Sequence, residues 1–121
     1  MAAPNPLPTY VYKILDAPPK DPLPGELPLS ELDKQDGFIH LSTANQVANT
    51  ANLFFDGYPS LWVLRVPLAR LADVRWEGGD AAGRAFPHLF GGKLGEEEVE
   101  SVKELKRPGG GWAGLEDEWL Q

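Results

Sequence analysis

Histidines are the side chains whose type and placement could do chemistry in this chain of 121 residues, which has two histidines and no cysteine. His40 and His88 lie in near-copies of one context, Phe38-Ile39-His40-Leu41 and Phe86-Pro87-His88-Leu89. The lack of cysteine excludes disulfide scaffolds, thiol nucleophiles and zinc sites built on sulfur. Acid–base chemistry or ligand binding by imidazole must therefore come from these two residues.

His40 is the stronger candidate because polar residues flank it on both sides. Asp36 and Gly37 precede it, and the hydroxyls of Ser42 and Thr43 follow it where a helix is predicted to begin. A histidine inside an apolar strand needs hydrogen-bond partners, either as a structural core residue or as a functional one. A helix N-terminus also offers unpaired N–H groups to an anionic ligand. We expect His40 to be the principal site residue, with helix capping as the alternative role for the two hydroxyls.

Three further residues are candidates for a supporting role. His88 follows a proline, which suits a strand end that presents a side chain. Arg84 lies in a glycine-rich loop, where a guanidinium can bind a phosphate or carboxylate. Glu77 ends a predicted strand beside Trp76, a setting that favours general acid–base use. The simpler alternative for the two charged residues is a solvated side chain.

Other kinds of active site lack their sequence signatures. The two histidines show no His-x-His or His-x3-His spacing, so no metal site is predicted. No Gly-x-Ser-x-Gly motif is present to mark a serine hydrolase. The formal charge of −7 argues against nucleic acid as the main partner, since phosphate backbones are bound by clustered Lys and Arg. With no signal peptide and no apolar span of ~20 residues, a cytoplasmic protein without a membrane contact is expected.

The elements that position these residues form one small domain. Eight of the twelve prolines fall in residues 1–28, which predicts an extended tail over 1–8 and a long irregular loop over 18–28. A single α+β domain is expected over residues 9–105, followed by a glycine-rich acidic extension over 106–121. That extension either docks through Trp112 and Trp119 or is unstructured.

Hydrophobic periodicity gives the individual elements. Strands are predicted over residues 10–15, 38–41, 61–66, 74–77 and 86–90, with a turn followed by a strand in 96–105. The strand over 61–66 is expected to be central. A helical turn over 30–34 should end near Gly37, and the main helix over 44–55 should bury a face with Val47, Ala51, Phe54 and Phe55.

Four blocks of this chain together resemble the family catalogued as domain of unknown function 952. The blocks are Tyr12-Lys13-Ile14, Asp36-Gly37-Phe38-Ile39-His40-Leu41-Ser42-Thr43, Arg75-Trp76-Glu77 and Phe86-Pro87-His88-Leu89-Phe90-Gly91. Their order and spacing cover roughly residues 10–105. Phe90 stands where the family pattern has a tyrosine, and the glycine-rich C-terminal stretch is additional.

The resemblance implies a small ADP-ribosyltransferase-like split β-sheet with one main helix, whose cleft takes a nicotinamide dinucleotide, an ADP-ribosyl group or a phosphorylated ligand. By analogy His40 holds the ribose or phosphate, Glu77 orients the attacked ribose, and His88 is a second polar or acid–base group. The remaining expected ligand-binding residues are Lys13, Ser42, Thr43, Arg84 and Phe86. The dinucleotide enters as a substrate, and no cofactor is otherwise implied.

Two alternatives remain open from the sequence. Two-histidine phosphoesterases pair two His-x-Ser/Thr motifs, one imidazole acting as base and one as acid. His40-Leu41-Ser42 satisfies that motif and His88-Leu89-Phe90 does not. The other alternative is a non-catalytic interaction domain that docks through Trp112 and Trp119.

Overall fold

The computed structural model describes residues 2–121 and, over that range, contains two three-stranded antiparallel sheets with two α-helices. In chain order the elements are β1 (Tyr10–Leu15), α1 (Glu31–Asp36), β2 (Ile39–His40), α2 (Val47–Phe54), β3 (Ser60–Pro67), β4 (Val74–Glu77), β5 (Phe86–Leu89) and β6 (Ser101–Lys106). Three 3-10 turns join them: η1 (Ala44–Gln46), η2 (Leu68–Arg70) and η3 (Trp112–Gly114). The predicted α+β class is confirmed, and each predicted strand is present with ends shifted by at most a few residues.

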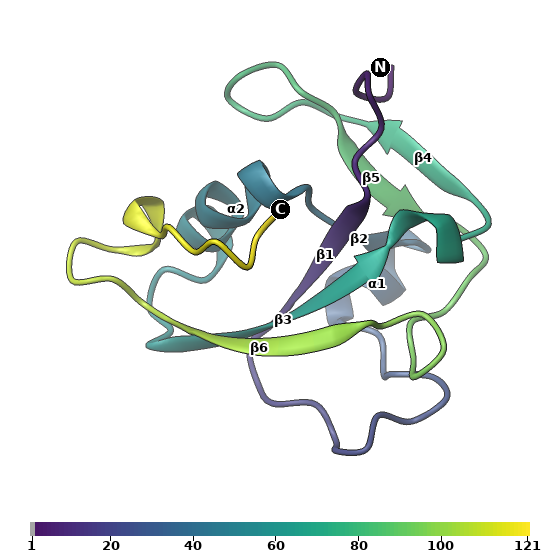
Figure 1. Ribbon diagram of the computed structural model, residues 1–121, viewed down its shortest axis with the longest axis horizontal. Helices are drawn as coiled ribbons and strands as arrows, with labels where there is room; N and C mark the ends of the chain where they lie inside the picture. Colours follow the sequence, from purple (N-terminus) through teal and green to yellow (C-terminus); the bar gives the residue numbers. More distant parts are fainter. Residues whose placement is uncertain (1) are drawn as a thin grey trace.

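The first sheet has the order β1-β3-β6, so the strand predicted to be central is central. β1 pairs with β3 from Tyr10 opposite Pro67 to Leu15 opposite Trp62. One face of this sheet packs against the second sheet through residues such as Val11 and Leu64. The opposite face packs against α2 and the C-terminal segment, which together cover it in Figure 1. Burial on both faces accounts for the continuous apolar run in β3.

The second sheet has the order β2-β5-β4 and consists of short strands. Ile39 pairs with Leu89 and His40 with His88, so the two similar sequence segments are antiparallel neighbours. Successive side chains in a strand point to opposite faces, so Ile39 and Leu89 enter the core. The same alternation turns both histidines away from that core.

The two sheets are joined by a pair of backbone hydrogen bonds beyond the end of β2. The Tyr12 N–H donates to the Ser42 carbonyl at 2.8 Å, and the Ser42 N–H donates to the Tyr12 carbonyl at 2.9 Å. This isolated bridge fixes the chain after β2 against β1. The histidine of β2 is therefore placed relative to both sheets.

Helix α1 begins and ends at residues suited to those positions. The side-chain oxygen of Ser30 accepts a hydrogen bond from the Asp33 N–H at 3.1 Å, which caps the first turn. Gly37 follows the helix with φ of 80°, in the left-handed region that glycine adopts without strain. The helical turn and its predicted end near Gly37 are confirmed.

Helix α2 follows η1 directly, and the prediction of its buried face is only partly right. Val47 and Ala51 are fully buried, and Phe55 is half-buried against the same core. Phe54 is 69% exposed. The two phenylalanines are adjacent in sequence, and at about 100° per residue an eight-residue helix turns one of them out.

The C-terminal segment is part of the packed structure. Trp112 is completely buried and its indole N–H donates to the Tyr58 carbonyl at 3.0 Å. Trp119 packs edge-on against Tyr12, and the Tyr12 hydroxyl exchanges hydrogen bonds with the Gln121 backbone. This segment, yellow in Figure 1, lies beside α2. Of the two alternatives left open by the sequence, the docked one is observed.

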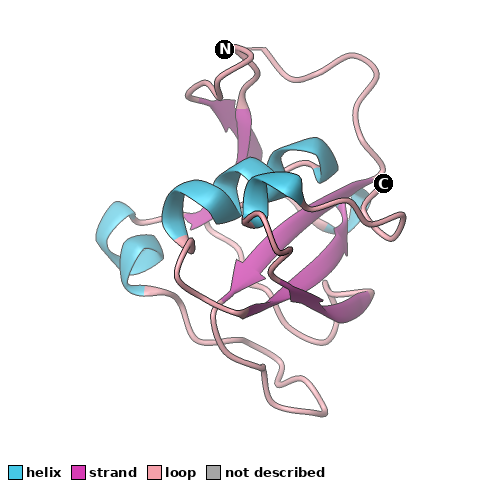
Figure 2. Ribbon diagram, turned by 90° about the vertical axis from the view of Figure 1, so that its left-hand side faces the viewer, coloured by secondary structure: helices cyan, strands magenta, loops and turns pink. Residues whose placement is uncertain are grey.

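The proline-rich loop between β1 and α1 packs closely against the segment that precedes β6. The Leu27 N–H donates to the Leu94 carbonyl at 2.7 Å, and the Glu96 N–H donates to the Pro24 carbonyl at 3.0 Å. A Cβ on Gly95 would lie 2.0 Å from the Gly25 carbonyl oxygen, so the backbones can approach this closely only at a glycine. The loop forms the lower edge of the molecule in Figure 1 and is free of helix and strand in Figure 2.

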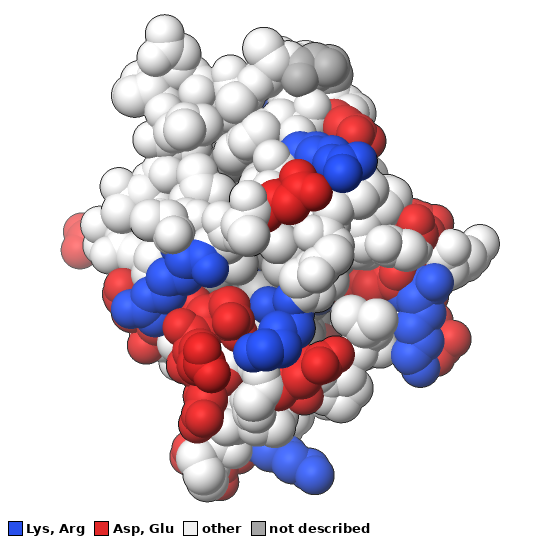
Figure 3. Space-filling model, turned by 90° about the vertical axis from the view of Figure 1, so that its right-hand side faces the viewer, with Lys and Arg blue, Asp and Glu red and all other residues white. Residues whose placement is uncertain are grey.

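Charged side chains of both signs are interspersed on the face shown in Figure 3, where Lys and Arg lie beside Asp and Glu. Ion pairs between charged side chains in residues 2–121 include Lys93 with Glu98 and Arg75 with Asp73. In the described part of the chain no helix reaches the length and apolar character needed to cross a membrane.

Candidate functional site

A cavity of about 790 Å³ lies where the first sheet, the second sheet and the proline-rich loop meet. Both histidines line it, together with Lys13, Ser42 and Phe86. Much of the remaining wall is apolar, contributed by Leu, Pro and Phe side chains of the loop, α1 and α2. A concave, mainly apolar cavity with a few convergent polar groups is the usual form of a small-molecule site.

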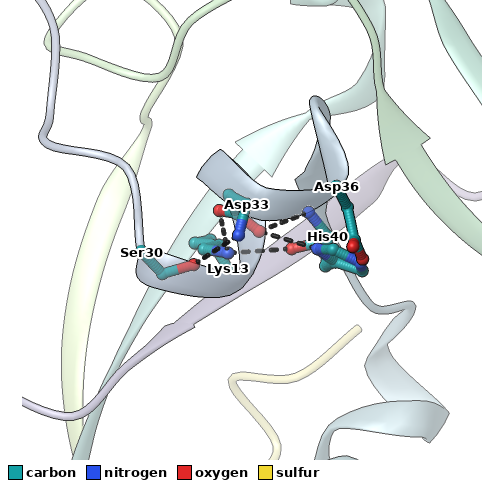
Figure 4. Close-up of polar contacts among 5 residues, drawn as sticks. All are labelled: Lys13, Ser30, Asp33, Asp36 and His40. Carbon is teal, nitrogen blue, oxygen red and sulfur yellow. Dashed lines mark hydrogen bonds and ion pairs between the residues drawn. The ribbon is translucent and has the colours of Figure 1, made fainter.

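His40 is held at both ring nitrogens by carboxylates from α1 (Figure 4). Its Nδ1 lies 2.7 Å from Asp33 Oδ1, and its Nε2 lies 2.9 Å from Asp36 Oδ2. Its backbone N–H also donates to Asp33 Oδ1 at 3.1 Å. The ring orientation is therefore fixed from the helix that precedes the strand.

Asp33 is the hub of this arrangement, with a side chain only 2% exposed. Besides His40, it accepts a hydrogen bond from Lys13 Nζ at 2.6 Å, and the same ammonium donates to the His40 carbonyl at 3.2 Å. Burial by itself would raise the pKa of Asp33. The hydrogen bond and charge of Lys13, with the two His40 contacts, outweigh it and hold that pKa below its usual value. Asp33 is thus a buried carboxylate that positions both Lys13 and His40.

His88 has a different environment from its cross-strand neighbour. The two imidazole rings lie with centroids 5.5 Å apart at 75°. Burial, and then the nearby His40, lowers the pKa of His88 below its usual value. Its Nδ1 is buried without a hydrogen-bond partner among residues 2–121. An unsatisfied nitrogen is a hydrogen-bond acceptor in the neutral ring, but this one is shielded from solvent, so a ligand can reach it only if its neighbours move.

Phe38 packs against both imidazoles and was not singled out from the sequence. Its ring centroid lies 4.9 Å from that of His40, 5.0 Å from that of His88 and 4.7 Å from that of Phe90. Arg75 completes the stack, with its guanidinium 4.1 Å from the Phe90 ring. A tyrosine at position 90 would place its ring in the same stack, so the phenylalanine keeps the packing and lacks only the hydroxyl.

Five of the eight site residues predicted from the sequence come together at the cavity: His40, His88, Lys13, Ser42 and Phe86. Lys13 is not a free cation there, because its ammonium is paired with Asp33. Ser42 is fixed through its backbone to Tyr12. Phe86 and His88 lie two residues apart on β5 and so share one face of the strand.

The other three predicted site residues lie elsewhere. Thr43 and Arg84 line a second hollow of about 500 Å³, formed with the N-terminal prolines. Arg84 is paired there with Asp80 at 2.9 Å, and the Thr43 N–H donates to the Gln46 side chain at 3.0 Å. Glu77 is exposed on β4, on the same sheet face as His88, and is not part of the cavity lining.

Asp33 is the site residue that the sequence interpretation missed. It lies seven residues before His40 inside a short helix, and nothing local distinguishes it from the other acids of that helix. The signal available in the sequence was the pair of acids, Asp33 and Asp36, that precede His40, with Gly37 between Asp36 and the histidine. No group of three or more His, Cys, Asp or Glu side chains in residues 2–121 has the arrangement of a metal site.

Comparisons with known proteins give a family and a structural relative. The family model described as "Protein of unknown function (DUF952)" matches residues 21–102. The crystal structure of protein CC0527 from Caulobacter crescentus is 36% identical, covers 84% of this chain and 90% of that one, and has a TM-score of 0.68. The solution NMR structure of the same protein is 34% identical, covers 85% and 90%, and has a TM-score of 0.63. No curated protein matches this chain.

Proposed function

The chain belongs to the DUF952 family, and we propose that its cavity binds a nucleotide-type ligand, a nicotinamide dinucleotide or an ADP-ribosyl group, with a ribose or phosphate oxygen against His40. The observation that supports this most directly is the convergence of His40 and His88 on one cavity of about 790 Å³. That volume lies within the range of small-molecule and cofactor sites, ~300–1,000 Å³. The proposal includes an ADP-ribosyltransferase-like arrangement of the two sheets.

The lining chemistry favours recognition of rings and ribose. Phe54, Phe55 and Phe86 offer apolar faces for a base or nicotinamide ring. The charged side chains of the lining are two lysines and three carboxylates: Lys13, Lys20, Asp16, Glu26 and Asp33. With Lys13 already paired, a cluster of cations for the pyrophosphate is not part of the cavity. The ribose and the rings should therefore contribute most of the affinity.

Isothermal titration calorimetry with nicotinamide dinucleotide and with ADP-ribose tests the proposal. Wild-type protein should give a binding isotherm with at least one ligand, and His40→Ala should weaken it by about tenfold or more, because a buried ligand oxygen loses its partner. Arg84→Ala is the matched control, since Arg84 lines the second hollow instead. The absence of heat with both ligands would refute the proposal. A loss of binding in Arg84→Ala alone would move the site to that hollow.

The paired histidines also support a second candidate, hydrolysis of a cyclic phosphodiester. Two imidazoles with unlike surroundings are suited to opposite roles in acid–base catalysis. His88, with its lowered pKa, would take a proton from the attacking water as a P–O bond forms, and His40 would protonate the oxygen that leaves as the other P–O bond breaks. Turnover of a 2′,3′-cyclic nucleotide that disappears in both His40→Gln and His88→Gln is expected. Turnover that persists in either variant would exclude this mechanism.

A further inference from the structure

Asp33 and Asp36 contact opposite nitrogens of the same imidazole, and the two contacts are not equivalent. Carboxylate oxygens accept hydrogen bonds, so both His40 contacts, at 2.7 and 2.9 Å, are hydrogen bonds only when each ring nitrogen carries a proton. In Figure 4 the two acids reach the ring from the same short helix. With both ring nitrogens protonated, His40 is a cation with two anionic partners.

One of these partners is buried and held by several groups, and the other is partly exposed and contacts the ring alone. The Asp33 side chain is 2% exposed and is held by Lys13 as well as by two groups of His40. The Asp36 side chain is 35% exposed, and within residues 2–121 its polar side-chain contact is with His40 Nε2. Asp36 is the last residue of α1 and precedes Gly37. A rotation of its side chain would break one contact and leave the rest of the network intact.

The charges around His40 balance only while Asp36 is in place. Lys13 and doubly protonated His40 carry two positive charges, and Asp33 and Asp36 carry two negative ones. If the Asp36 carboxylate leaves Nε2, one positive charge beside the cavity is uncompensated. The nearest replacement for that carboxylate is another anionic oxygen, because charge-assisted hydrogen bonds are roughly twice as strong as neutral ones.

We propose that Asp36 occupies the position of the ligand's acceptor oxygen, and that a ligand with an anionic oxygen binds His40 Nε2 by displacing the Asp36 carboxylate. The inference rests on the proposed function in using the same His40, and it adds the chemical class of the group bound there. A phosphate oxygen of a nucleotide and free inorganic phosphate share this chemistry. An uncharged hydroxyl does not, since it would leave the cation unpaired.

The test uses 15N-histidine NMR of the full chain at constant pH, with inorganic phosphate and ADP-ribose as probes. In wild-type protein, phosphate should shift the Nε2 resonance of His40 and leave Nδ1, which stays on Asp33, nearly unchanged. Asp36→Ala should bind phosphate about fivefold more tightly, which corresponds to loss of one partly exposed ion pair. Asp36→Asn, which keeps the shape of the side chain, should show the same direction of change.

Glu31→Ala is the matched control, because it removes one negative charge from the opposite end of the same helix, where Glu31 is 94% exposed. It should leave phosphate affinity unchanged. Equal affinities in Asp36→Ala and Glu31→Ala would overturn the inference, as would the failure of phosphate to shift Nε2 in either wild type or Asp36→Ala. If phosphate shifts Nε2 and ADP-ribose does not bind, the inference stands and the proposed nucleotide ligand is wrong.

Discussion

The two sheets of this protein differ in strand length and in how many of their faces are buried. The first, β1-β3-β6, has strands of six to eight residues and is covered on both faces, by the second sheet on one side and by α2 and the C-terminal segment on the other. The second, β2-β5-β4, has strands of two to four residues and presents both histidines on the face away from the core. Apolar burial stabilises both faces of the first sheet. The second sheet has one face in the core and carries His40 with its polar contacts on the other.

The difference shows how a small domain combines stability with a polar site. Polar groups are costly to bury, so His40 lies on the sheet that packs on one face only, and its two carboxylate partners come from the neighbouring helix α1. The polar network is nevertheless anchored in the first sheet, since Lys13 of β1 is the cation that holds Asp33. Precision at the site is therefore supplied by the more stable region.

The largest expected effect tests the first sheet. Trp112→Ala should lower the free energy of unfolding by about 3–5 kcal/mol, because a fully buried indole leaves a large cavity and the Tyr58 carbonyl loses its partner. Trp76→Ala, on the partly buried β4, is the matched change in the second sheet and should cost about 1–2 kcal/mol. Urea denaturation measures both. Equal losses would show that the two sheets contribute alike and would end the contrast.

The next effect concerns the ion pair between Lys13 of the first sheet and Asp33 of α1, which connects that sheet to the network around His40. Lys13→Met should destabilise the protein by about 3 kcal/mol, since it leaves the Asp33 carboxylate buried without its strongest partner. In Lys13→Met/Asp33→Leu both buried charges are gone, and part of the loss should be recovered. The double-mutant cycle is read from urea midpoints. A loss below about 1 kcal/mol for the single change would class the pair with exposed salt bridges.

A smaller effect is expected where the proline-rich loop meets the segment before β6. Gly95→Ala places a methyl group 2.0 Å from the Gly25 carbonyl oxygen, so the loop must shift, at a cost of about 1–3 kcal/mol. Because this loop forms one wall of the cavity, ligand affinity should fall as well. Gly109→Ala, with no atom within 4 Å of the new methyl group, is the control for thermal denaturation and for binding. Matching melting temperatures for the two variants would contradict the close approach.

The smallest expected effect is a dependence of stability on pH through His88. Because the pKa of His88 is lowered in the folded protein, the unfolded chain takes up a proton at higher pH than the folded one does. The stabilising contribution is therefore complete above the usual histidine pKa of about 6.5 and is lost as the pH falls below it. Urea midpoints at pH 7.5 and 5.5 should differ more for wild type than for His88→Gln. Equal differences would show that His88 titrates normally.

Most elements of the fold were predictable from local sequence. The alternation in β1, the apolar run of β3, and Ser30 and Gly37 at the ends of α1 all act within a few residues, which is the range that periodicity and capping rules cover. Phe54 is the local error: α2 ends at this residue and turns its side chain outward, and it is the following Phe55 that is half-buried, a choice the sequence does not reveal.

The site was only partly predictable. The sequence by itself determined that any imidazole chemistry depends on His40 and His88 and that cysteine chemistry is excluded. The period-two alternation of a strand also places each histidine side chain on the face away from its apolar neighbours in the sequence. The tertiary structure alone decided that the two histidines pair across β2 and β5, that Asp33 unites Lys13 with His40, and that Arg84, Thr43 and Glu77 lie outside the cavity. The reason is distance along the chain: Lys13 and Asp33 are 20 residues apart and His40 and His88 are 48 apart, so only sheet pairing and packing bring them together.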